Sequence, residues 1–113
     1  MLHLIDMRKV HISKDVFKNI ETSHGIFFFR YNEEDTEGDY VIADEVVCSC
    51  QNPTYDVLVS AIIHTRYSTD SELAILANYL SDPTNEQHLA EYNAYQQWRD
   101  TVKTACKEYF TQS

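Results

Sequence analysis

The stretch YDVLVSAIIHTRY, from Tyr55 to Tyr67, is the segment around which we expect the rest of the chain to pack. Its apolar residues recur at three- and four-residue spacing, which predicts an amphipathic helix. They are Tyr55, Leu58, Val59, Ile62 and Ile63, and Val57 and Ala61 widen the stripe. Because so few positions of this helix are polar, we expect neighbouring segments to cover most of its sides.

Two more helices are predicted after this one. Thr69 and Glu72 have the spacing of a capping box, so a helix is expected from Thr69 to about Leu80. Its apolar stripe consists of Leu73, Leu76, Ala77 and Leu80. A longer helix is expected over residues 84–110, with a stripe made of Leu89, Tyr92, Tyr95, Trp98, Val102, Ala105 and Tyr109. Asn52-Pro53 and Asp82-Pro83 each predict an N-cap followed by Pro at the first helical position.

The N-terminal part carries β patterns instead. Apolar residues alternate at Leu2, Leu4, Val10 and Ile12, which predicts one or two short strands, and residues 13–20 predict a helical turn or an irregular connector. Residues 25–50 predict a hairpin, because two apolar arms flank the polar segment NEEDTEGD. Asp44-Glu45 interrupts the second arm and indicates a bulge or an exposed edge.

These patterns together predict an α+β fold. An N-terminal antiparallel β-hairpin or small sheet is expected, followed by three C-terminal α-helices. A chain of 113 residues can bury a core of its own, so residues 1–113 are interpreted as a single domain. Residues 1–51 form its β-rich part and residues 52–113 its helical part.

The charge is strongly acidic, with 18 Asp and Glu against nine Lys and Arg, for a net charge of −9. Phosphate recognition needs a basic surface, so we expect no nucleic-acid partner. An acidic surface that mimics DNA and captures a basic protein is kept as an alternative. No apolar run is long enough for a membrane span, and the start of the chain lacks the pattern of a secretion signal. The odd set of three cysteines favours a reduced, intracellular protein.

Residues that bind metals or act as nucleophiles are scattered. Cys48 and Cys50 could hold a soft metal, but a zinc site needs four ligands and Cys106 is the only other thiol, so packing is the competing interpretation. The histidines are His3, His11, His24, His64 and His88, and only His88 has a carboxylate, Glu91, at helical spacing. We therefore predict no metal and no cofactor.

An enzyme is not expected either. A nucleophile elbow requires glycine at a strand-to-helix turn, and both glycines, Gly25 and Gly38, belong to the hairpin region. Asp44 and Glu45 would be a general acid–base pair only if a cleft perturbed them; adjacent acids are more often surface residues. A metal-dependent enzyme is retained as the least favoured alternative.

A family resemblance points further. The residues Ala43-Asp44-Glu45-Val46, the helix VSAIIHTRYS and the C-terminal pattern Glu91-Tyr92, Ala94-Tyr95 and Trp98-Arg99 resemble small proteins encoded in the structural regions of phages and prophages of gut bacteria. The last pattern is also similar to the C-terminal helices of tail-fibre assembly proteins. The resemblance covers the chain after Gly25 and implies a virion or tail-assembly role made of contacts, with no catalytic residues to carry over.

The leading hypothesis is therefore a non-enzymatic protein of phage or prophage origin, in the bacterial cytoplasm or the virion. It would act on a virion or tail protein, and self-association is a further option. Trp, Tyr and Arg most often anchor interfaces, so Tyr92, Tyr95, Trp98 and Arg99 are the candidate contact residues. Packing of these residues on the helix at 55–67 is the competing interpretation.

Overall fold

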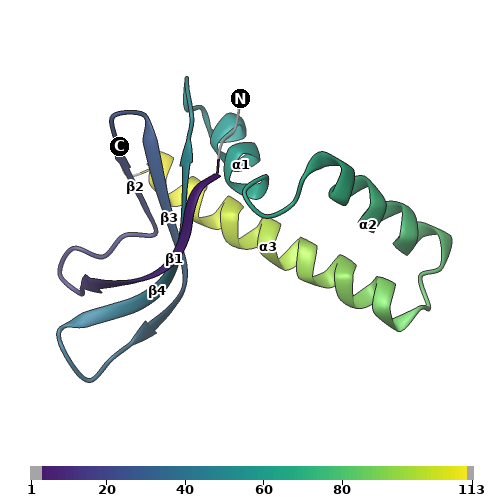
Figure 1. Ribbon diagram of the computed structural model, residues 1–113, viewed down its shortest axis with the longest axis horizontal. Coiled ribbons are helices and arrows are strands. Elements are labelled where there is room, and N and C mark those ends of the chain that lie inside the picture. Colours follow the sequence, from purple (N-terminus) through teal and green to yellow (C-terminus); the bar gives the residue numbers. More distant parts are fainter. Residues whose placement is uncertain (1–3, 112–113) are drawn as a thin grey trace.

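Four strands precede three helices in the computed structural model, which describes residues 4–111 (Figure 1). The strands are β1 (Leu4–Ser13), β2 (Ile20–Ser23), β3 (Ile26–Asp35) and β4 (Tyr40–Ser49), and the helices are α1 (Tyr55–Ile63), α2 (Thr69–Ser81) and α3 (Glu86–Thr111). The predicted α+β class, with an N-terminal sheet and three C-terminal helices, is confirmed. Leu2 of the predicted alternation lies outside the described residues.

The strands form one antiparallel sheet in the order β1-β4-β3-β2. The predicted hairpin is β3–β4, at the centre of the sheet. The N-terminal alternation continues as one strand of ten residues, and β2 was not predicted at all. Four residues, Ile-Glu-Thr-Ser, are too few to display a period of two, and pairing with β3 decides their conformation.

The adjacent acids Asp44-Glu45 suggested a bulge in this region. A bulge does lie opposite Asp44, but it belongs to β3 and not to β4. The register of β3 against β4 shifts between Tyr31 and Glu34, and Asn32 within that interval has a φ of 53°. Asn tolerates this left-handed conformation better than most residues. The expectation of an exposed edge was wrong, because β4 pairs with a strand on each side.

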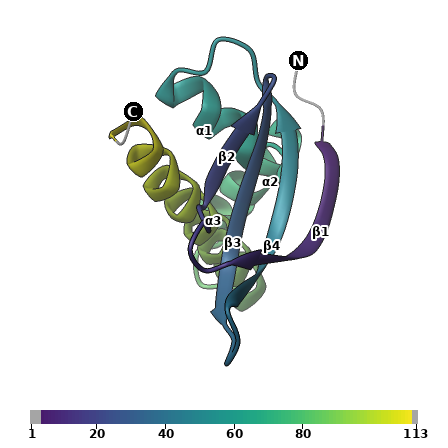
Figure 2. The ribbon, with the colours of Figure 1, turned by 90° about the vertical axis from the view of Figure 1, so that its left-hand side faces the viewer.

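Helices α1 and α3 cover one face of the sheet (Figures 1 and 2). Phe29 and Tyr31 point into this layer, where their rings meet Trp98 of α3 edge-on at 5.7 and 4.8 Å between centroids. Helix α1 contributes the predicted buried residues Leu58, Val59, Ile62 and Ile63. Less of the surface of α1 is covered than expected, since Val57 is 44% exposed. The helix is also shorter, because it ends at Ile63 and not at Tyr67.

The predicted N-caps Asn52, Thr69 and Asp82 were wrong by one to three residues. The observed caps are Thr54, Ser68 and Asn85, whose side chains accept hydrogen bonds from the backbone N–H groups of Val57, Ser71 and His88. Several residues able to cap stand side by side at each helix start, and packing selects among them. Within residues 4–111, no helix is long and apolar enough to cross a membrane.

Candidate functional site

A row of charged side chains crosses the sheet on the face opposite the helices. Each strand supplies one member: Arg8 from β1, Glu45 from β4, Arg30 from β3 and Glu21 from β2. Glu45 accepts from Arg8 Nε and from Arg30 Nε, each at 2.9 Å. Arg30 Nη1 donates to Glu21 Oε1 at 2.7 Å. We call these four residues the charged row.

The charged row is buried at its centre because the sheet coils and the chain between β1 and β2 crosses this face (Figure 2). That connector supplies the carbonyl of Lys18, which accepts from Arg30 Nη1 at 3.3 Å. Glu45 is 2% exposed and Arg30 7% exposed. The expectation that Glu45 lies on the surface was therefore wrong. Both of its oxygens accept hydrogen bonds from arginines, an arrangement that holds strands together.

The three cysteines, Cys48, Cys50 and Cys106, are free and buried. Burial raises the pKa of Cys48 to about 11 and that of Cys106 to about 12, so both thiols stay protonated at neutral pH. All three belong to the main core cluster. Among the described residues no group of three or more His, Cys, Asp or Glu could hold a metal ion, and packing is the role the geometry assigns to these thiols.

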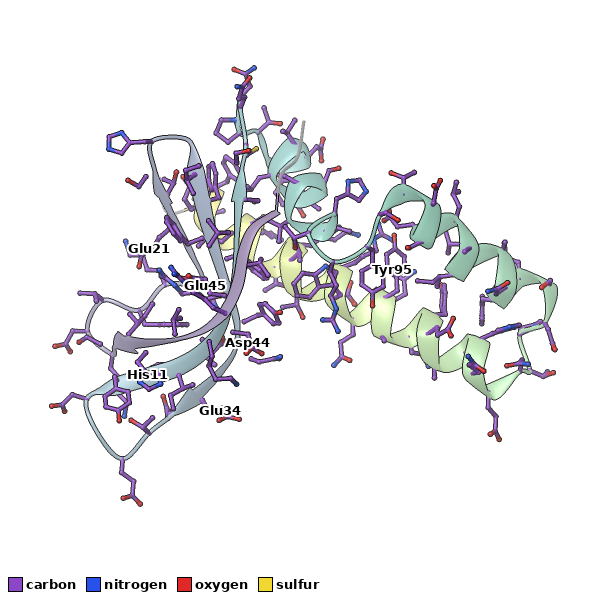
Figure 3. The ribbon with its side chains drawn as sticks, viewed as in Figure 1. His11, Glu21, Glu34, Asp44, Glu45 and Tyr95 are labelled. Carbon is purple, nitrogen blue, oxygen red and sulfur yellow. The ribbon has the colours of Figure 1, made fainter. Side chains whose placement is uncertain are left out.

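A second polar cluster joins the three helices. Glu72 on α2 accepts from the hydroxyl of Tyr95 on α3, and its other oxygen lies 2.8 Å from His64 Nε2 at the end of α1. We call Glu72, His64 and Tyr95 the clamp; Figure 3 labels Tyr95 between α2 and α3. Burial, followed by the hydrogen bond to Glu72, raises the pKa of Tyr95 to about 12, which keeps its hydroxyl a donor. Glu72 thus has a different role from the capping residue that the sequence suggested.

Aromatic rings and arginines surround the clamp. Tyr67 meets Tyr95 edge-on at 5.0 Å. The Arg66 guanidinium lies 5.1 Å from the centroid of Trp98, and that of Arg99 lies 5.7 Å from the centroid of Tyr95. Contacts of this kind are worth about 0.5–1 kcal/mol each where they are solvated. The clamp is therefore braced against the end of α1 and the middle of α3.

Together with Ser60, the clamp residues His64 and Glu72 are the residue types of a nucleophilic relay, and Ser60 Oγ lies 3.4 Å from His64 Nδ1. A relay of this kind also needs free backbone N–H groups around the nucleophile to stabilise an oxyanion. Ser60 sits inside α1, where backbone N–H groups are used by the helix. The geometry assigns these residues to holding helices together.

The four candidate contact residues occupy different environments. Tyr95 is 3% and Trp98 4% exposed, and the Trp98 indole donates to the Ile63 carbonyl at 3.4 Å. They pack against the region of α1, as in the competing interpretation. Tyr92 is partly buried and stacks on Tyr79 of α2 at 4.1 Å, and Arg99 is partly buried beside Tyr95.

The surface that the structure leaves open lies on α2. Helix α2 and the facing half of α3 form an antiparallel pair that extends away from the sheet, and we call residues 69–95 the arm (Figure 1). Leu73 is 61% and Leu80 75% exposed, and Ala77 between them is exposed as well. The prediction that these residues form the core stripe of α2 was wrong. The face toward α3 instead carries Glu72, Ile75, Leu76 and Tyr79, all partly buried.

Leu89 of α3 lies on the same side of the arm as these leucines. Tyr79 and Tyr92 mark the inward faces of the two helices. In an antiparallel pair, side chains that follow an inward-facing residue by one position share one side, because each residue turns the helix by about 100°. Leu80 follows Tyr79 in this way, and Leu89 follows His88, whose ring Nδ1 is buried. Leu89 is 38% exposed.

The arm carries negative charge only. Between Arg66 and Arg99 the sequence has no Lys or Arg, and it has five carboxylates: Asp70, Glu72, Asp82, Glu86 and Glu91. All but Glu72 are exposed. Among the described residues no hydrogen bond or ion pair joins His88 to Glu91: Glu91 accepts from Gln87 at 3.2 Å, and His88 Nδ1 is buried without a hydrogen-bond partner. His3 lies outside the described residues.

Comparison with protein-family models, with curated proteins and with solved structures found no match. Function therefore has to be inferred from the geometry of the charged row, the clamp and the arm.

Proposed function

We propose that this chain is a non-enzymatic protein of phage or prophage origin that acts by docking to another protein, as a tail-associated component or an assembly factor. The arm is the docking element, and its exposed leucines are the observation that carries this proposal. Leu73 and Leu80 lie on a helix with no buried residue. An apolar surface of this kind on a projecting element is typical of a contact site.

The partner surface that fits the arm is a basic amphipathic helix. Its apolar residues would cover Leu73, Leu80 and Leu89, and its Lys or Arg residues would face Asp70 and Glu86. A second copy of this chain is disfavoured, because it would bring an arm with the same negative charge against this one. The clamp holds the arm against α1, so that the contact surface is presented in one orientation.

Binding of an 18-residue peptide of leucine and lysine, patterned as an amphipathic helix, tests the docking role. We expect saturable binding that weakens as salt rises from 50 to 500 mM, because exposed charges are screened. The double variant Leu73→Asp with Leu80→Asp should bind about tenfold more weakly or worse, since two apolar contacts are lost. Val57→Asp, at a 44% exposed position of α1, is the matched control and should bind as the parent does.

Two results would overturn the docking role of the arm. One is equal binding of a scrambled peptide with the same composition, and the other is equal binding by the double Asp variant. Light scattering over a concentration series tests whether a second copy of this chain occupies the arm. A dimer that is lost in the double Asp variant would show that it does.

The phage assignment has its own test. In a phage that encodes this chain, deletion of the gene should yield particles with absent or incomplete tails by electron microscopy, and the double Asp variant should fail to restore them. Normal tailed particles after deletion would overturn the assembly role. The protein would be found in the host cytoplasm, in the virion or in both.

An acidic inhibitor that mimics DNA is the second candidate, favoured by the absence of any cation between Arg66 and Arg99. A target captured by this chain would then be released by duplex DNA, because both ligands would occupy the same basic surface. An assembly partner would stay bound at the same ionic strength.

A further inference from the structure

β2 is an open edge of the sheet. Arg30 N donates to the Asn19 carbonyl at 2.7 Å, which makes this a hydrogen-bonded pair. Such pairs alternate with non-bonded ones in an antiparallel ladder, so the backbone groups of Ile20 and Thr22 point away from β3. No strand lies beyond β2, and within residues 4–111 no backbone group bonds to these two residues.

A groove runs beside this edge. One hollow of about 500 Å³ lies along Ile20, Glu21 and Thr22 and reaches Tyr109 of α3. A second, of about 330 Å³, shares Ile20 and Tyr109 and adds Phe17 and Ala105. The side chains of Ile20 and Thr22 point toward α3, because they pair with Phe29 and Phe27 on the core face. The groove therefore combines free backbone groups with an apolar wall.

The rim of the groove is acidic. Asp15, Asp100 and Glu108 line it or the adjoining hollow between β3 and α3, and none of them makes an ion pair with a described residue. Arg30 borders the hollow between β3 and α3, but its guanidinium lies on the opposite face of the sheet, where Glu45 and Glu21 match its charge. Lys18 remains as the opposing cation. A ligand with positive charge is favoured here.

We propose that the β2 edge and this groove bind an extended, basic segment of a partner chain, which adds to the sheet as a fifth, antiparallel strand. The amide and carbonyl groups of Ile20 and Thr22 supply the ladder hydrogen bonds, as in other cases of strand addition. Alternate side chains of the segment fill the hollow at Ile20 and Tyr109, and the basic residues between them point to the other face of the sheet, beside Glu21 and Asp15 at the mouth of the same hollow. This site is separate from the arm, whose ligand is a helix.

A capped seven-residue peptide of alternating valine and lysine is the probe. We expect saturable binding, with slower hydrogen exchange at the amides of Ile20 and Thr22 when the peptide is bound. The valine amides face β2 in this pairing and the lysine amides face solvent. N-methylation of two valine amides should therefore weaken binding about tenfold or more, because two hydrogen bonds are lost, while N-methylation of two lysine amides should leave it unchanged.

On the protein, Thr22→Pro removes an N–H that points away from β3. An edge strand tolerates proline at such a position, so the sheet should persist. The variant should bind about tenfold more weakly, since one hydrogen bond is lost and the ring obstructs pairing, whereas Thr22→Val should bind as the parent does. If Thr22→Pro fails to fold, the two N-methylated peptides decide the question alone.

The proposal is overturned if the valine- and lysine-methylated peptides bind equally well. It is also overturned if the protected amides lie between Leu73 and Leu80 instead of on β2, because the peptide would then be a ligand of the arm. Absence of binding at 1 mM peptide overturns it without affecting the docking role proposed for the arm.

Discussion

Glu45 in the sheet is 2% exposed, whereas Leu80 in the arm is 75% exposed. The sheet, α1 and the second half of α3 form the body of the molecule. The body buries the carboxylate of Glu45 and pairs it with two arginines. The arm instead exposes most of the surface of Leu73 and Leu80. The buried charges of the body and the exposed leucines of the arm are two reversals of the usual placement of these residue types.

The two reversals have different physical meanings. The charged row is satisfied within the chain, and its hydrogen bonds connect all four strands, so it selects a single strand register. Leu73 and Leu80 of the arm gain little from folding, because most of their surface stays in water. This exposed apolar surface is the basis of the docking role proposed for the arm.

Glu45→Gln is expected to have the largest effect on the body. It leaves two arginines facing a neutral amide at a buried site, and loss of one partner of a buried pair costs about 3–5 kcal/mol. The free energy of unfolding in urea measures this loss. Glu34→Gln, at an exposed position of β3, is the matched control and should change stability by less than about 0.5 kcal/mol. A loss below 1 kcal/mol for Glu45→Gln would mean that the charged row does not hold the sheet.

Leucine truncation compares the two regions directly. Leu58→Ala in α1 should cost about 3 kcal/mol, because the side chain is fully buried and leaves a cavity. Leu80→Ala in the arm should stay within about 0.5 kcal/mol. Thermal and urea unfolding of both variants measure the difference. Equal losses would show that the arm packs against the body and would remove the basis for a docking surface.

Tyr95→Phe probes the connection between the regions. Loss of its bond to the partly buried Glu72 should cost about 1–2 kcal/mol and increase hydrogen exchange in α2. Because folding raises the pKa of Tyr95 from 10.0 to about 12, its contribution is complete below pH 10 and is lost as pH rises to 12. The variant should therefore lose less stability than the parent over that interval. Tyr92→Phe is the control, and an identical alkaline profile for parent and Tyr95→Phe would contradict the clamp.

The rate of thiol alkylation at pH 8 compares how accessible the two regions are to solvent. It is the smallest perturbation of the four, because the native cysteines are not mutated. Cys48 and Cys106, with pKa values of about 11 and 12, should react at least about 100-fold more slowly in the folded protein than in urea. A cysteine introduced by Leu80→Cys should react at nearly the rate of the unfolded chain. Rapid modification of the native cysteines would show that the body opens under native conditions.

The order and type of most elements could be predicted, since long segments such as IFFFRY and YDVLVSAII carry clear periods of two and 3.6. The missed element, β2, shows the limit: its four residues take their conformation from β3. Helix starts were located to within three residues, because serine, threonine and asparagine compete for each cap.

The functional surfaces were less predictable. Tyr95 and Trp98 are residue types that are common in interfaces, yet packing near the end of α1 buries both of them. The stripe of Leu73, Leu76, Ala77 and Leu80 has the period of a core face, but only Leu76 of these lies on the face toward α3, which Glu72, Ile75 and Tyr79 complete. A helix with two neighbouring apolar stripes does not indicate which one is covered. The adjacency of Asp44 and Glu45 similarly hides that only Glu45 meets arginines.

Local patterning alone determined the fold class, the hairpin, the three helices and the acidic charge, because these follow from residue spacing and composition. Tertiary structure decided the strand order, the burial of Glu45, the clamp and the side of α2 that stays open. Those features depend on which segments, distant in sequence, come to lie together. Glu45 is one acid among many in the sequence, and it becomes structural only where Arg8 and Arg30 arrive from neighbouring strands.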